Sequence, residues 1–142
     1  MTTITCIHPW TGVVDYRYPL MDDAAVEASL AGADSAFADW SARGLDERGA
    51  FLRQAAAVFR SRRDEIAATM GAEMGKLRRE CLGEIEKCAG ALEFYAGQAH
   101  RWLADEGVGT EARRSFVAYE PIGPVFAIMP WNFPMWQVVR FV

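Results

Sequence analysis

Residues 124–129 have the sequence Pro-Val-Phe-Ala-Ile-Met, an apolar run without one polar side chain. Such a run is typical of a β-strand that is buried on both faces, as in a parallel sheet. Pro124 is compatible with this assignment because it would occupy the first position of the strand. One buried strand cannot satisfy its own backbone N–H and C=O groups without neighbouring strands. We therefore predict an α/β fold, of which these 142 residues form the first part.

Two amphipathic helices are predicted upstream of this run. Asp22 or Asp23 can cap the first helix, and Gly44 is expected to end it. The second helix begins near Asp46 and is expected to break near Ser61. Their apolar stripes follow helical spacing. The predicted stripe residues are Val26, Leu30, Ala33, Phe37 and Trp40 in the first helix, and Phe51, Ala55, Val58, Phe59, Ile66 and Met70 in the second region.

A third and longer helix is predicted over about residues 77–104, and two of the three cysteines stand on its stripe. Cys81 and Cys88 are seven positions apart, which is about 10 Å along a helix and beyond the reach of a disulfide. The sequence contains no CxxC or HExxH spacing, so we expect no zinc site. We interpret both cysteines as core residues. The full predicted stripe is Cys81, Ile85, Cys88, Leu92, Tyr95, Ala99 and Trp102.

Short strands are predicted on both sides of the helical region. Residues 4–7 and 13–18 flank a turn at residues 8–12 that contains Pro and Gly. Residues 114–120 alternate between polar and apolar side chains, which is typical of a half-exposed antiparallel strand. A further helix is predicted from Met135 onward.

Charge and hydropathy exclude two classes of partner. The net charge is −4, so there is no basic excess to neutralise a nucleic-acid backbone. The longest apolar run, residues 121–131, is much shorter than the roughly 20 residues that a membrane-spanning helix needs. The first ten residues lack the basic and apolar regions of a secretory signal. We therefore expect a cytoplasmic protein with no nucleic-acid or membrane partner.

Asn132 follows the predicted buried strand and stands between two aromatic residues and two prolines. In open α/β sheets, ligands bind at the carboxyl ends of strands. An amide fixed in an apolar setting is suited to stabilising a developing negative charge. The alternative is that Asn132 caps the helix that follows, which is common at strand-to-helix turns. The residues alone leave both interpretations open and favour the cap.

Several motifs resemble those of one enzyme family. The segment Ala127–Pro134 (AIMPWNFP) resembles the PWNFP motif of the aldehyde dehydrogenase superfamily, and Glu73–Lys76 (EMGK) and Pro9–Gly12 (PWTG) resemble two further elements. The segments 33–40 and 84–96 are similar as well, so the likeness covers nearly the whole chain. The continuation PMWQVVRF looks most like the succinate-semialdehyde dehydrogenase branch. His8, Trp10 and Leu77 depart from the family pattern.

The resemblance implies a domain assignment. Residues 1–142 would be the N-terminal part of the cofactor-binding domain, with the run at 124–129 as the first buried strand of its Rossmann-like sheet. Residues of about 110–121 would belong to the arm through which family members oligomerise. The catalytic domain, with its nucleophilic cysteine, would be absent from these residues.

The resemblance also implies roles for single residues. Asn132 matches the asparagine that helps form the oxyanion hole, and Arg140 matches an arginine that pairs with the carboxylate of the substrate in this branch. Cofactor contact with NAD or NADP is implied for Ile128, Met129, Pro130, Trp131 and Asn132.

The implied function is the oxidation of succinate semialdehyde, or a related aldehyde, to the acid through a cysteine thioester. The full enzyme would be a homo-oligomer, and the isolated chain would be inactive. The alternative is a truncated, non-catalytic module that binds partner subunits.

Overall fold

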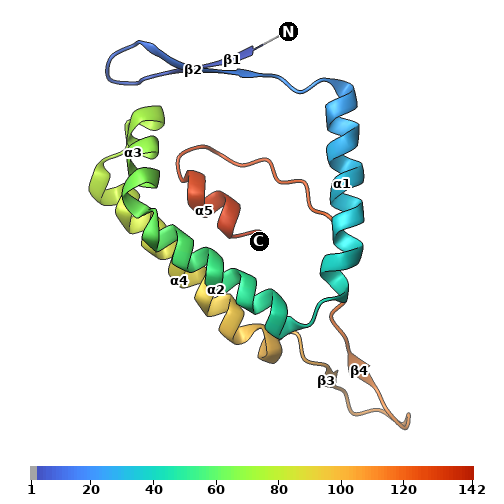
Figure 1. Ribbon diagram of the computed structural model, residues 1–142. Helices are drawn as coiled ribbons and strands as arrows, with labels where there is room; N and C mark the ends of the chain where they lie inside the picture. Colours follow the sequence, from blue (N-terminus) through green and yellow to red (C-terminus); the bar gives the residue numbers. More distant parts are fainter. Residues whose placement is uncertain (1–2) are drawn as a thin grey trace.

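The computed structural model describes residues 3–142. Three helices lie together, and a fourth helix stands beside them (Figure 1). One β-hairpin lies at each end of this arrangement. The fifth and shortest helix lies over the middle of the bundle. The elements in chain order are β1 (Thr3–Ile7), β2 (Val14–Pro19), α1 (Asp23–Ala42), α2 (Leu45–Ser61), α3 (Arg63–Met74), α4 (Arg78–Trp102), β3 (Glu106–Gly107), β4 (Phe116–Val117) and α5 (Pro134–Val139).

The N-terminal hairpin confirms the prediction of two strands around a turn. β1 and β2 pair in antiparallel register, from Thr3 opposite Pro19 to Ile7 opposite Val14. His8 donates its backbone N–H to the Val13 carbonyl at 2.8 Å, which closes the turn. Gly12 adopts a φ of 70°, a left-handed conformation that glycine adopts at little cost.

Helix α1 begins as predicted but ends differently. The Asp22 carboxylate accepts a hydrogen bond from the Ala25 N–H at 2.8 Å and caps the helix. The helix ends at Ala42 with Arg43 as its C-cap, and Gly44 follows directly; Gly44 has φ of −64° instead of the left-handed conformation of a terminating glycine, and it is the N-cap of α2. The apolar stripe of α1 is not buried: within residues 3–142 no residue of this helix is fully covered, although Phe37 is half-buried and Trp40 packs against Phe51.

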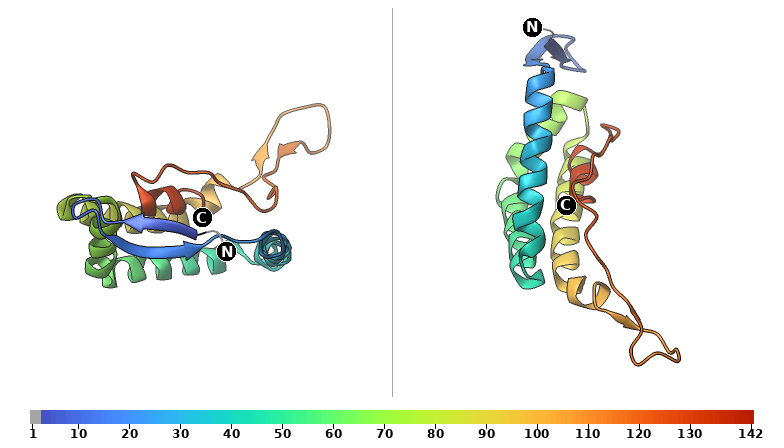
Figure 2. Two further views of the ribbon diagram at one scale, coloured as in Figure 1. Left: turned by 90° about the horizontal axis from the view of Figure 1, so that it is seen from above. Right: turned by 90° about the vertical axis from the view of Figure 1, so that its right-hand side faces the viewer.

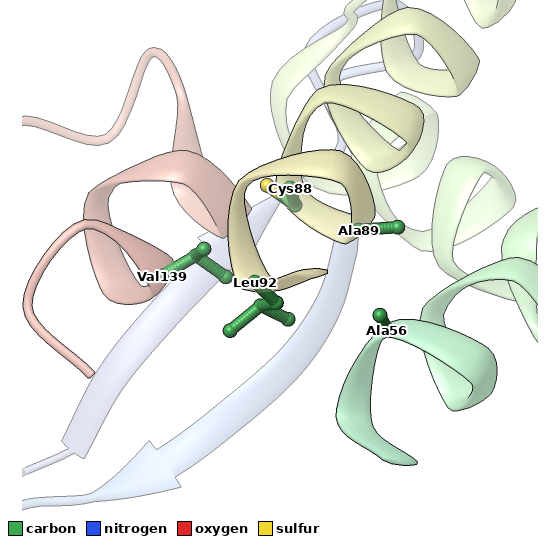
Figure 3. Close-up of a cluster of buried hydrophobic side chains, with 5 residues drawn as sticks. All are labelled: Ala56, Cys88, Ala89, Leu92 and Val139. Atoms are coloured by element: carbon green, nitrogen blue, oxygen red, sulfur yellow. The ribbon is translucent and has the colours of Figure 1, made fainter. Parts of the chain in front are cut away.

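The core lies where α4 meets α2, α3 and α5. Figure 3 shows Ala56 of α2 facing Ala89 of α4, and Val139 of α5 facing Leu92. A second cluster joins α3 to α4 through Ala67, Met70, Cys81 and Ile85. The predicted break between α2 and α3 is confirmed at Arg62.

The buried face of α2 differs from its predicted stripe. Phe51 and Val58 are exposed, while Gly49 and Ala56 are buried. The reason is close helix packing, because a Cβ added at Gly49 would meet the Ala96 carbonyl oxygen at 3.4 Å. Small side chains therefore form the α2–α4 contact. The stripe of α4 is buried from Cys81 to Leu92, but its last aromatic residues, Tyr95 and Trp102, are exposed.

The predicted strand at residues 124–129 is not formed within residues 3–142. Phe126 and Ile128 are 85% and 84% exposed. The prediction depended on neighbouring strands, and no strand of the described chain pairs with this segment. The prediction for residues 114–120 was also too long, since only Phe116–Val117 pairs, with Glu106–Gly107. Figure 2 shows this short hairpin projecting away from the helices.

Candidate functional site

An open cleft lies between the start of α4 and the turn that precedes α5. It has a volume of about 710 Å³. Its lining combines two lysines and two glutamates with Asn132 and apolar side chains. The lining residues are Met74, Lys76, Glu80, Gly83, Glu84, Lys87, Asn132 and Phe133. The cleft therefore brings Asn132 beside charged groups from two other segments of the chain.

Glu84 is the one charged residue in the core of the described chain, with 4% of its surface exposed. One carboxylate oxygen, Oε1, accepts hydrogen bonds from the backbone N–H groups of Met135 and Trp136, both at 3.0 Å. These are N–H groups of the first turn of α5, which have no partner inside that helix. Glu84 of α4 therefore caps α5 from a distance of more than 50 residues in sequence.

Lys76 neutralises this buried carboxylate. Its ammonium forms an ion pair with Glu84 Oε2, and the two side chains are only 8% and 2% exposed. Lys76 Nζ also donates to the backbone carbonyl oxygen of Asn132 at 3.2 Å. The same nitrogen lies 4.1 Å from the centre of the Phe133 ring, a cation–π contact. One lysine thus contacts the carboxylate, the carbonyl and the ring.

The local sequence explains why Lys76 reaches this position. Gly75 ends α3 in the left-handed conformation, with φ of 69°. A Cβ at Gly75 would meet Pro9 Cγ at 3.1 Å and Trp10 Nε1 at 3.2 Å. The N-terminal turn therefore packs directly against the residue that precedes Lys76, and it fixes where α3 ends.

Asn132 does not cap the helix that follows it, so the interpretation that the residues alone favoured was wrong. The N-cap position is Phe133, and the capping acceptor is Glu84 rather than a local side chain. Within the described chain, the Asn132 side chain forms no hydrogen bond. It is exposed and lines the cleft. The amide is therefore available to a group that enters the cleft.

The residues predicted to contact the cofactor do not all share this cleft. Met129, Pro130 and Trp131 line a separate hollow of about 500 Å³, which is bounded by α5. Asn132 lines the first cleft instead, and Ile128 is exposed and lines neither. The turn at residues 131–133 therefore separates an apolar hollow from a charged cleft.

Arg140 is at the C-terminal end of α5 and is exposed. Its Nη1 lies 3.4 Å from the side-chain oxygen of Gln137. Arg140 lines neither hollow. Its backbone N–H donates to the Trp136 carbonyl, so it lies one helical turn beyond Trp136. The Lys87 ammonium lies 3.7 Å from the centre of the Trp136 ring. Lys87 of α4 therefore contacts α5 through Trp136, whereas the Arg140 guanidinium lies beside Gln137 and Phe141.

Sequence reasoning missed Glu84, Lys76 and Lys87 as parts of the site. A signal for Glu84 was present, because position 84 lies three residues after Cys81 and four before Cys88, on the buried stripe of α4. A charged residue on such a stripe needs a buried partner. The N–H groups of α5 that bind this carboxylate could not be identified from the sequence, since Met135 lies 51 residues away.

The cysteines are core residues, as predicted for Cys81 and Cys88, and both are buried and free. Burial raises the pKa of the Cys81 thiol, and it raises the pKa of Cys88 to about 11. Thiols with raised pKa values are poor nucleophiles at neutral pH. Neither cysteine is therefore suited to attack a carbonyl group.

Two features are absent from residues 3–142, and both bear on other functions. The described residues contain no group of three or more His, Cys, Asp or Glu side chains that could hold a metal ion. Every helix in the same range is too short or too polar to cross a lipid bilayer.

Comparison with known sequences identifies relatives over the whole length of the chain. The model of the aldehyde dehydrogenase family matches residues 1–142. A Synechocystis protein named "Probable succinate-semialdehyde dehydrogenase [NADP(+)]" is 44% identical over 97% of this chain and 30% of its own length. The succinate-semialdehyde dehydrogenase [NADP(+)] of Deinococcus radiodurans is 36% identical over 95% of this chain and 28% of its own. The chain therefore spans about 30% of the length of these relatives.

Solved structures agree with the sequence comparison. The Streptococcus pyogenes succinic semialdehyde dehydrogenase in complex with NADP+ superposes with a TM-score of 0.90 at 32% identity, over 96% of this chain and 30% of that chain. The structure of PnpE with nicotinamide adenine dinucleotide gives a TM-score of 0.89 at 28% identity, over 97% of this chain and 28% of that chain. The α/β fold predicted from sequence is confirmed as the N-terminal part of this architecture.

Proposed function

The chain belongs to the aldehyde dehydrogenase family, and we propose that it is the N-terminal part of the cofactor-binding domain of an enzyme that oxidises succinate semialdehyde or a related aldehyde to the carboxylic acid. The observation that carries the proposal is the position of Asn132, which lines the charged cleft and whose side chain is not used to cap α5. The relatives named above support the choice of substrate.

Asn132 is the residue to which we assign oxyanion stabilisation. When a cysteine thiolate adds to the aldehyde carbonyl, the electron pair of the C=O bond moves to oxygen, which becomes negatively charged. The Asn132 amide can donate a hydrogen bond to that oxygen. Loss of one such donor costs on the order of 10²–10³ in rate. The thiolate belongs to another part of the enzyme, because Cys81 and Cys88 are buried and the pKa values of all three thiols, that of Cys6 included, are raised.

NAD or NADP fits the hollow beside Met129, Pro130 and Trp131. Its lining is mostly apolar and includes two exposed aromatic residues, Trp131 and Phe141. Such a surface suits a flat nicotinamide ring and its ribose. We assign Ile128, Met129, Pro130, Trp131 and Asn132 to cofactor contact. When bound, the nicotinamide accepts the hydride that leaves the aldehyde carbon.

Arg140 is assigned to the carboxylate of succinate semialdehyde. A guanidinium is charged at every relevant pH and can bind a carboxylate through two hydrogen bonds. Among the described residues, its side chain is bonded only to the neutral Gln137. Its charge is therefore available to a substrate that approaches α5.

Residues of about 110–121, which include β4, form the arm that we assign to homo-oligomerisation. Phe116, Val117 and Tyr119 are exposed on it. Light scattering of the full-length protein measures the oligomeric state, and deletion of residues 110–121 is expected to lower it. An unchanged oligomer would contradict this assignment.

The function is tested by comparing the 142-residue chain with the full-length polypeptide that contains it. We expect the full-length protein to reduce NAD+ or NADP+ with succinate semialdehyde, and the 142-residue chain to be inactive. Asn132→Ala should lower kcat about 10²–10³-fold. Arg140→Met should raise KM for succinate semialdehyde but leave KM for butanal, which has no carboxylate, unchanged.

Three results would contradict the proposal. A full-length protein without aldehyde-oxidising activity would favour the alternative of a non-catalytic module that binds partner subunits. Activity in the 142-residue chain would show that the remaining polypeptide is not required. Equal effects of Arg140→Met on both aldehydes would remove the assignment of Arg140.

A further inference from the structure

We propose that Glu84 and Lys76 are positioning residues that hold the backbone at the Asn132 carbonyl and in the first turn of α5, and thereby aim the Asn132 amide into the cleft. The inference rests on the proposed role of Asn132 as the oxyanion donor. It concerns a different pair of residues, which contact the turn and not the reacting atoms.

The two anchors hold the backbone at Asn132 and shortly after it along the chain. Lys76 holds the carbonyl oxygen of Asn132 itself, at 3.2 Å. Glu84 holds the N–H groups of Met135 and Trp136, each at 3.0 Å. Only Phe133 and Pro134 lie between these contacts, and the proline ring fixes one backbone angle and restricts the residue before it. The backbone from the Asn132 carbonyl to the first turn of α5 is therefore held at both ends.

The direction of the Asn132 side chain depends on this backbone. No other side chain in the described range bonds to its amide, so contacts of the amide itself do not orient it. The orientation follows from the backbone at residues 132–134, which is set by Lys76 and Glu84. A shift of about 1 Å in a reacting group can lower a rate by about 10²-fold.

The origin of the cap explains why the amide is available. An asparagine at the start of a helix ordinarily uses its side chain to cap that helix. Here Glu84, from another helix, accepts the first N–H groups of α5. The cap from a distant helix leaves the Asn132 amide unused. Glu84 therefore has two effects, since it fixes the turn and keeps Asn132 from capping.

Both anchors are themselves fixed to the core. Glu84 is adjacent to Ile85, which is fully buried between α3 and α4. Lys76 follows Gly75, which is packed against the N-terminal turn. A buried ion pair is a poor source of stability compared with apolar packing, but it can specify one geometry. The Lys76–Glu84 pair specifies where the turn at residues 131–133 lies relative to the bundle.

The test uses the full-length enzyme with Glu84→Leu, which removes the acceptor. We expect kcat to fall about 10²-fold, with little change in KM for the aldehyde or in Kd for the cofactor, because oxyanion contacts form only in the transition state. Glu84→Gln keeps an acceptor oxygen and should lose less activity. The matched control is Glu86→Leu on the same helix, since Glu86 pairs with Arg60 and does not contact α5. This control should keep the parent kcat.

A double variant separates a positioning role from a merely structural one. If Glu84 acts through Asn132, then Glu84→Leu should lower kcat no further in an Asn132→Ala background. Multiplied losses would overturn the inference and leave the role of Asn132 intact. A normal kcat in Asn132→Ala alone would overturn the proposed function itself. If Glu84→Leu does not fold, Lys76→Met provides the same comparison, because it removes the anchor on the Asn132 carbonyl.

Discussion

The Leu92 side chain of α4 packs against residues of both α2 and α5. Its side chain is 2% exposed and lies in the cluster that contains Ala56 of α2 and Val139 of α5 (Figure 3). Truncation to alanine leaves a cavity that faces α5 on one side and α2 on the other. The substitution therefore tests whether the cluster is the stabilising core of these residues.

The expected cost follows from burial. Leucine-to-alanine changes at fully buried sites cost about 2.7–5 kcal/mol, through lost transfer free energy and the cavity. Small neighbours such as Ala56 and Ala89 have no long side chains that could fill the space, but the cleft side of α5 is open and can relax. We expect about 3 kcal/mol, near the lower end of that range. If the free energy of unfolding falls by about 2 kcal/mol per M of urea, the urea concentration at the unfolding midpoint should fall by about 1.5 M.

Urea unfolding of the 142-residue chain, followed by circular dichroism, measures this change. Leu30→Ala is the matched control, because it makes the same substitution in a helix where the side chain is 55% exposed. A surface change of this kind should shift the free energy of unfolding by less than about 0.5 kcal/mol. If Leu92→Ala lowers the midpoint no more than Leu30→Ala does, the cluster around Leu92 does not stabilise the fold.

Three further predictions concern the glycine turn, the surface charges and the buried thiol. Gly75→Ala should destabilise the chain more than Gly12→Ala. Both positions have a positive φ, but an added Cβ would contact Pro9 and Trp10 only at Gly75. Thermal unfolding of both variants measures the difference. Arg60 lowers the pKa values of Glu86 and Glu93 by hydrogen bonding, so the stability that it provides is present above about pH 4.5 and is lost as the pH falls further. Because these groups are exposed, Arg60→Met should cost little stability at pH 7, and the unfolding curves of the two proteins should converge as the pH falls through the lowered pKa values of Glu86 and Glu93. Burial raises the pKa of Cys88 from 9.0 to about 11. The free energy of unfolding should therefore fall as the pH rises through this interval, by about 1.4 kcal/mol per pH unit. Cys88→Ala should lack this loss, and equal pH profiles of the two proteins would contradict the assignment of Cys88 as a buried thiol.

The sequence by itself determined the secondary structure that depends on local signals. Asp22 caps α1 as its side-chain chemistry predicts, and Gly12 closes the first hairpin. The break after Ser61 and the buried half of α4 were also predicted, because helical periodicity and charge are properties of neighbouring residues. The position of Asn132 at the end of an apolar run indicated a candidate site before its surroundings were known.

Only the tertiary structure decided which groups surround Asn132 and which acceptor caps α5. The residues near Asn132 favoured a local cap, but the acceptor is Glu84, which is brought there by the packing of α4. The apolar run at residues 124–129 was assigned to a strand, yet it is exposed, because a strand needs partners that residues 3–142 do not provide. Local patterns fix the conformation of a segment, whereas a buried charge or a sheet depends on partners that are distant in sequence, and their positions follow from the packing of the whole chain.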